Sequence, residues 1–265
     1  MKRITLLLMA VLIVLALIGC ATVKTGMQDP ATLPEQASEA PEVPGTEATP
    51  GYEVSVPATN PDTPSDSYGV YVTVKSNAIQ RISDKIEGND ELSLTVGLGM
   101  LPVTMIDLSL LPLSVLSMEG AESALAMFGM TTADISRNGN DYSITYSDRE
   151  GKTFTQTCSY DPAADTLQSS VLEGGIETLF FEYVRVGNGY AAQYYYDNGD
   201  GKYKTITMFF NDTDTIAYGI MSSDEKPASI KGGSLTVDFV KNDESYCIMQ
   251  GDALTVFDKG EAKSY

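Results

Sequence analysis

The chain has 265 residues, with 36 acidic and 17 basic side chains, no histidine and a formal net charge of −19 at pH 7. Nucleic acid and anionic lipid headgroups are poor partners for such a charge, so we exclude nucleic-acid binding. Because histidine is absent, Ser-His-Asp and Cys-His catalysis and the common zinc sites are excluded as well. The sequence also has no Gly-rich phosphate loop. We therefore expect no catalytic residue, no metal site and no cofactor.

The first residues are organised like an export signal. Lys2 and Arg3 form a basic start, and residues 4–18 are apolar except for Thr5. A basic flank, an apolar run of this length and a small residue, Gly19, before the cut are typical of a secretory signal. The run is shorter than the roughly 20 residues that a membrane-spanning helix needs. An uncleaved N-terminal anchor helix is the alternative interpretation.

The end of this run, Leu17-Ile18-Gly19-Cys20, resembles the lipobox of bacterial lipoproteins. The resemblance implies that the signal, residues 1–19, is cut between Gly19 and Cys20 and that the thiol of Cys20 carries a diacylglyceryl group. Two acyl chains suffice for stable anchoring. The implied location is the outer face of the cell membrane, with the lipid bilayer as a partner through Cys20. The mature chain would keep 15 basic and 36 acidic residues, a net charge of −21.

Residues 20–66 differ sharply in composition from the rest of the chain. They hold eight of the twelve prolines and eight acidic residues, against the single base Lys24. With few bulky apolar side chains, such a segment cannot bury enough surface to offset the entropy lost on ordering. We predict a lipidated N-terminus followed by a disordered tether rich in Pro, Glu and Thr. It precedes one domain, residues 67–265.

Residues 67–130 are expected to be mainly helical. Residues 68–87 fit two patterns, because Val70, Val72 and Val74 alternate as in a strand, whereas Val74, Ala78, Ile82 and Ile86 share one helical face. We prefer a helix, at least from Lys75 onward. A further short helix is expected within residues 119–130.

The stretch 92–118 is almost uncharged and long enough to cross a membrane, with Asp107 as its one charged residue. Pro102 and Pro112 interrupt helical hydrogen bonding, and a carboxylate near the middle is costly in lipid. We therefore predict buried helices that pack on the apolar face of a sheet.

Residues 140–258 are expected to be mainly β, because apolar and polar side chains alternate with period two between turn signals. About eight to ten strands follow from this rhythm of hairpins. The predicted strand segments are 142–147, 153–160, 176–186, 190–196, 203–210, 215–221, 235–240, 246–249 and 254–257. The predicted fold class is α+β, an antiparallel β-meander packed against an N-terminal apolar helical layer.

In its order of elements and its anchor the chain is similar to half-barrel lipoproteins such as the outer-membrane lipoprotein carrier. This resemblance implies a curved sheet and a helical lid around an apolar cavity.

Three features within the domain are candidate sites. Cys158 and Cys247 either form a disulfide, as exported thiols often do, or remain two unpaired core cysteines. Residues 197–201 resemble a calcium loop, but the first ligand position falls on Tyr196 and no closing glutamate follows, so a hairpin turn explains them better. Tyrosines could offer an aromatic platform for a glycan or peptide, although sheet packing is the simpler role. They are Tyr183, Tyr190, Tyr194, Tyr195, Tyr196 and Tyr203.

These observations lead to three functional hypotheses. The first is a non-enzymatic, membrane-anchored lipoprotein that binds an apolar or amphiphilic ligand between sheet and helices. The second is a module that interacts with a protein or with the cell wall. The third, a hydrolase that uses acidic residues without histidine, would require two carboxylates that converge in one cleft.

Overall fold

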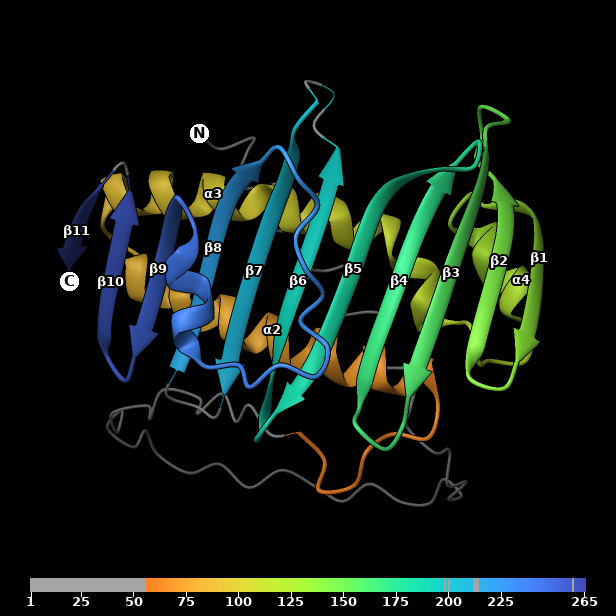
Figure 1. Ribbon diagram of the computed structural model, residues 1–265, viewed down its shortest axis with the longest axis horizontal. Coiled ribbons are helices and arrows are strands. Elements are labelled where there is room, and N and C mark those ends of the chain that lie inside the picture. Colours follow the sequence, from red (N-terminus) through yellow and green to blue (C-terminus); the bar gives the residue numbers. More distant parts are fainter. Residues whose placement is uncertain (1–55, 198, 200, 212–214, 259) are drawn as a thin grey trace, which may run out of the picture. The chain divides into compact units, whose positions relative to one another are not determined.

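The computed structural model describes residues 56–265 except 198, 200, 212–214 and 259 (Figure 1). Helices come first: α2 (Pro64–Ile86), α3 (Asp90–Ser109), the short 3-10 helix η1 (Leu111–Ser114) and α4 (Ala121–Met127). A second 3-10 helix, η2 (Val237–Asn242), lies between two of the strands that follow. The strands are β1 (Thr131–Asn138), β2 (Asp141–Ser147), β3 (Thr153–Asp161), β4 (Thr166–Glu173), β5 (Ile176–Val186), β6 (Gly189–Asp197), β7 (Tyr203–Asn211), β8 (Thr215–Ser223), β9 (Ser245–Gln250), β10 (Ala253–Asp258) and β11 (Glu261–Ser264).

The strands form one open antiparallel sheet in which each strand pairs with the next along the chain, from β1 to β11. The predicted α+β class, a meander against N-terminal helices, is confirmed. The described residues form eleven strands, more than the eight to ten that were expected. Three of them, β1, β4 and β11, were not among the predicted segments. β1 and β11 are edge strands with mostly exposed side chains, and β4 carries Gln168, Ser169 and Ser170 in its middle. None of the three has the apolar alternation on which the sequence interpretation depended.

Helix α2 runs across the strands on one face of the sheet, and α3 returns antiparallel to it on the same face (Figure 1). The Thr63 hydroxyl accepts a hydrogen bond from the backbone N–H of Asp66, and Pro64 opens the helix, both favourable at a helix N-terminus. The buried side chains of α2 recur at helical spacing, including Tyr71, Val74 and Ala78. The helical interpretation is therefore confirmed for residues 68–86, and Glu87 caps the helix.

The core between α2 and the sheet is rich in tyrosine. Tyr71 stacks on Tyr183 with ring centroids 4.6 Å apart, and its hydroxyl is hydrogen-bonded to that of Tyr194. Tyr183, Tyr190 and Tyr194 are fully buried. Burial raises the pKa of the Tyr194 phenol well above its usual value. These tyrosines pack the sheet, as the simpler interpretation holds, because their rings fill the space beneath α2 while each hydroxyl group has a hydrogen-bond partner: Tyr71 with Tyr194, Tyr183 with Ser67, and Tyr190 with Asp165.

On the opposite face, the connection between β8 and β9, residues 224–244, crosses the sheet as a strap in front of β5–β8 (Figure 1). Ile230 and Val240 of the strap pack against Phe209 and Ile248. The prediction of a strand at residues 235–240 is wrong, since residues 237–242 form η2 and residues 235–236 precede it without strand pairing. The reason is topological: β8 pairs directly with β9, for example Ile216 with Met249, so the sheet offers no free edge to the strap there.

The described fold begins before the expected boundary at residue 67. The Tyr160 hydroxyl donates to the backbone carbonyl of Pro61 at 2.6 Å, and the Asn60 amide donates to that of Pro162 at 2.9 Å. Arg185 donates to the backbone carbonyl of Pro57 at 2.7 Å. Residues 56–66, which the sequence analysis assigned to the tether, are thus attached to the sheet. The rest of the predicted tether lies outside the described residues.

Candidate functional site

Helix α3 is apolar on two opposite faces. The Asn89 side chain caps it by accepting from the backbone N–H of Leu92 at 3.1 Å. An inner stripe, which includes Val96, Val103 and Ile106, is buried against the domain. An outer stripe is solvent-exposed and consists of Leu94 (62% exposed), Leu101 (39%), Met105 (66%) and Leu108 (40%). A helix that is apolar all round is normally buried or lies in a membrane.

The predicted burial of residues 92–118 is therefore correct for the inner stripe and wrong for the outer one. By length and composition α3 could cross a membrane, and 24% of its most apolar window is buried inside the domain. The cause of this exposure is position: α3 lies on the same face of the sheet as α2 and contacts the domain with one side only (Figure 1). The outer stripe needs a separate explanation.

A buried ion pair joins the two helices. The Lys75 ammonium group of α2 lies 2.5 Å from the Asp107 carboxylate of α3, and the exposed fractions of these side chains are 2% and 12%. Burial raises the pKa of Asp107, against the opposing effect of Lys75. The Lys75 ammonium group also lies 3.5 Å from the Tyr194 hydroxyl and above the ring of Tyr71. Asp107, which argued against a lipid-spanning segment, thus has its own cation inside the domain.

Between α3 and strands β8–β10 lies a cleft of about 330 Å³. Its apolar lining includes Val96 of α3, Tyr218 and Ile220 of β8, and Val256 of β10. Gly99 faces the sheet here, where the Tyr218 hydroxyl donates to the Gly99 carbonyl across the gap. A methyl group added at Gly99 would meet the Tyr218 ring at 3.7 Å. The missing side chain therefore keeps this part of the cleft open.

The polar groups of the cleft are few. Thr95, Ser245 and Asp258 lie in its wall, and the Ser245 hydroxyl donates to Asp258 at 2.8 Å. The thiol of Cys247 also lines it, and burial raises the pKa of this thiol to about 12. Since the thiolate is the nucleophile, this shift lowers the reactivity of Cys247 at neutral pH. An apolar hollow with a few polar groups in its wall suits a small apolar or amphiphilic molecule.

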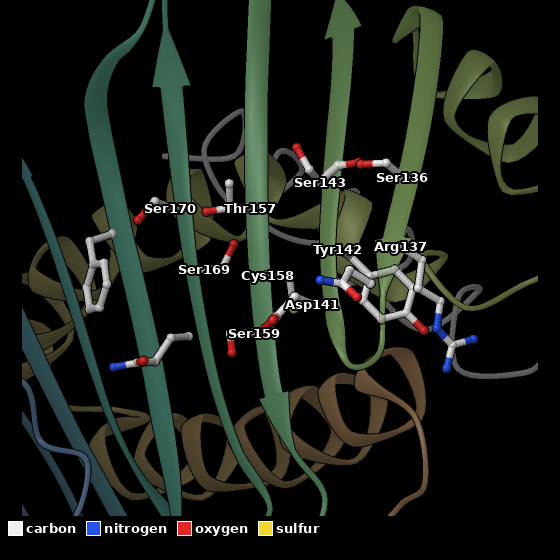
Figure 2. A pocket seen from close by; sticks show the side chains of 13 residues that line it. Ser136, Arg137, Asp141, Tyr142, Ser143, Thr157, Cys158, Ser159, Ser169 and Ser170 are labelled. Carbon is white, nitrogen blue, oxygen red and sulfur yellow. The ribbon is translucent and has the colours of Figure 1, made fainter.

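A second hollow, of about 540 Å³, lies on the other face of the sheet over strands β1–β5 (Figure 2). We call it the polar trough. Its side chains come from neighbouring strands in register: Ser136 opposite Ser143, Ser143 opposite Thr157 and Thr157 opposite Ser170. Asp141 is the one carboxylate among the lining residues. The trough therefore offers mainly hydroxyl and amide groups, with one acidic and one basic side chain, Asp141 and Arg137.

The strap passes beside this trough at Ser229 and is held there by Glu182. The Glu182 carboxylate is fully buried. It accepts hydrogen bonds from Gln193 at 3.1 Å, the Ser229 hydroxyl at 2.7 Å and the Ile230 backbone N–H at 2.9 Å. Gln168, which also lines the trough, donates to Glu182 at 2.8 Å. Glu182 thus fixes the strap over β5–β8, and Gln168 of β4 also donates to Ser229 of the strap at 3.1 Å.

The sequence-predicted site residues are scattered. Gly19 and Cys20 lie outside the described residues, so cleavage and lipidation stay predictions. Cys158 on β3 and Cys247 on β9 are free thiols. Because strands β4–β8 separate β3 from β9 in the sheet, the disulfide alternative is wrong and the unpaired one is correct. Burial raises the pKa of Cys158 to about 12 as well.

The remaining candidates are the calcium-like segment and the acidic side chains. Asp197 pairs with Tyr203 at the end of the β6–β7 hairpin, as expected of a turn. Positions 198 and 200 lie outside the described residues. Among the described residues no three His, Cys, Asp or Glu side chains are grouped so as to hold a metal ion. The cleft and the trough, which the sequence analysis did not locate, have one lining carboxylate each, Asp258 and Asp141.

Comparison with known proteins adds no further guide. No protein-family model, no curated protein and no solved structure matches this chain.

Proposed function

We propose that this protein is an extracytoplasmic lipoprotein, anchored through acylated Cys20, whose domain binds an apolar or amphiphilic ligand in the cleft between α3 and β8–β10. It acts as a binding protein and not as an enzyme. The observation that carries the proposal is the apolar cleft beneath a helix that is itself apolar on both faces. The lipobox-like sequence at its N-terminus supports the anchor.

The size of the cleft limits the ligand. Small-molecule sites usually enclose about 300–1,000 Å³, so a cleft of about 330 Å³ suits one acyl chain or a similarly slender molecule. Apolar groups would lie against Val96, Ile220 and Val256, while Thr95 and Ser245 could hydrogen-bond to a polar end.

The test fills the cleft without disturbing the helix. Gly99→Leu places a side chain against Tyr218, whereas at Gly97, two residues earlier, an added Cβ meets no atom within 4 Å, so Gly97→Leu is the control. Both changes raise helix propensity equally, by roughly 0.8 kcal/mol. Titration with the fluorescent fatty acid cis-parinaric acid should give saturable binding to the wild type and to Gly97→Leu. Binding to Gly99→Leu should be at least tenfold weaker.

Thermal unfolding of both variants checks that each remains folded. Absence of saturable binding to the wild type, or equal affinity of the two leucine variants, would contradict a ligand in this cleft.

A second candidate function is adhesion to a neutral polymer such as a cell-wall glycan. What favours it is the polar trough, an in-register surface of hydroxyl and amide groups in a chain that is otherwise strongly anionic. In a sedimentation assay with purified wall, Thr157→Glu in the trough should reduce retention of the protein. Thr153→Glu, on the same strand and face but outside the trough, should not. Equal retention of both would reject this function.

A further inference from the structure

We propose that the outer stripe of α3 lies in the boundary between headgroups and acyl chains of the same bilayer that holds the acyl chains of Cys20. The protein would then contact the membrane twice, through its lipid and through one face of its domain. This inference rests on one part of the proposed function, the anchor at Cys20, and does not require a ligand in the cleft.

The exposed apolar side chains of the domain are concentrated in the helical layer. Seven of the nine large exposed hydrophobic residues of the described chain lie between residues 94 and 128. They are the four residues of the outer stripe together with Met118, Met127 and Phe128. Scattered exposed apolar residues are ordinary, but a contiguous group on one element marks an interaction surface. The strands contribute one such residue, Ile176.

The outer stripe has the geometry of a continuous contact line. Leu94, Leu101 and Leu108 are seven residues apart, two helical turns, and Met105 fills the interval between the last two. At 1.5 Å per residue the stripe is about 21 Å long. Such a line can lie flat along an apolar boundary, as monotopic helices do when they bury one face in the interface.

The charges around α3 permit this contact. Between Glu91 and Glu119 the one charged residue is Asp107, and its carboxylate points inward to Lys75. No charged side chain of the outer stripe has to lose its water when the stripe enters an apolar layer, which would otherwise be costly. This arrangement explains why the charge of the stretch lies on the inner face.

The occupant follows from the anchor and from charge. From Ala21 to Ser55 the chain outside the structure has 35 residues, so even fully extended it reaches about 120 Å from Cys20. The domain is therefore confined near the bilayer, where a high effective concentration makes weak contacts count. Pairing two copies through the stripe would instead bring together two strongly anionic chains, each with a net charge of −19 before processing, which repel one another.

The test measures lipid contact directly in the tethered protein. The lipidated protein is purified in detergent, reconstituted in phosphatidylcholine vesicles and labelled with the environment-sensitive dye NBD at Met105→Cys. The buried thiols of Cys158 and Cys247 do not compete for the label. The matched control is Thr157→Cys, an exposed position on the opposite face of the sheet. Nitroxide-labelled lipid should quench the dye at position 105 at least threefold more than the dye at position 157.

A second variant tests the stripe itself. Leu101→Glu adds a charge one turn from the label, and it should reduce quenching at position 105 to that of the control while circular dichroism stays unchanged.

The outcomes separate the two proposals. Protein that does not float with the vesicles refutes the anchor. Protein that floats but shows equal quenching at both positions refutes the lipid contact of α3 and leaves the anchor standing. A third outcome also refutes the lipid contact: the dye at position 105 is shielded from water but is not quenched by lipid, and energy transfer places it close to a second labelled copy. That outcome identifies the occupant as a second copy.

Discussion

At the scale of single residues, the buried acids are the features with the largest consequences. Asp243, at the start of the segment that leads into β9, is 5% exposed. It accepts a hydrogen bond from Thr207 and packs against Gly219, where any larger residue would overlap its carboxylate. Burial raises the pKa of Asp243 to about 7, the Thr207 hydrogen bond opposes the shift, and Glu244 adds to it. The folded protein therefore binds a proton that the unfolded chain has released.

The sign of this linkage predicts how stability depends on pH. Between pH 4 and 7 the folded state holds more protons than the unfolded state, so the stability contributed by protonated Asp243 is lost as pH rises. We expect Asp243→Asn to match the wild type near pH 4 and to exceed its free energy of unfolding by roughly 2–4 kcal/mol near pH 8. Urea unfolding across this range is the measurement. The exposed Asp238→Asn is the control, and a variant curve parallel to that of the wild type would contradict the assignment.

At the scale of elements, α3 shows how one helix can be held by few contacts. Its inner stripe packs on the domain, and the Lys75–Asp107 pair and the Tyr218–Gly99 hydrogen bond add two polar attachments. The almost unbroken apolar sequence of α3 hides the difference between its two faces. Only the packing of α3 against the rest of the domain makes one face inner and leaves the other outer.

The ion pair gives a prediction for this element. Asp107→Leu leaves the ammonium group of Lys75 buried without its carboxylate, which should cost about 3–5 kcal/mol in free energy of unfolding. The double variant Lys75→Met with Asp107→Leu removes both charges and should recover most of that loss. Urea unfolding of the two variants measures the difference. If the double variant is as unstable as the single one, the loss of stability comes from the changed packing of the site and not from the unpaired charge.

At the scale of the whole molecule, the anchor decides where the domain acts. We expect the wild-type protein to carry acyl groups on an N-terminal Cys20 and to partition into the detergent phase. Cys20→Ala has no thiol for the thioether and should show no acyl mass, whereas Cys158→Ala, which changes a buried core thiol, should remain acylated. Intact-mass spectrometry distinguishes these outcomes. A wild-type protein of 28.5 kDa with its first 19 residues and an unmodified Cys20 would refute the anchor.

Much of the fold followed from local patterns. Alternation and turn residues predicted eight of the eleven strands in the described part of the chain, because a half-buried strand shows its two faces in its own sequence. The polar or edge strands β1, β4 and β11 lack that pattern and escaped prediction. The alternation at residues 235–240 was misleading, because its apolar side chains face the sheet from a 3-10 helix in the strap.

The sequence alone determined the fold class, the helical layer, the strand order and the expectation of an export signal with a lipid-modified cysteine, since each depends on neighbours along the chain. Only the tertiary structure decided which face of α3 is exposed, where the cleft and the trough lie, and that Cys158 and Cys247 are apart. These depend on residues far apart in sequence, such as Tyr218 and Gly99, which are separated by 119 positions. Such pairs leave no periodic trace in a single sequence, because packing and not local propensity brings them together.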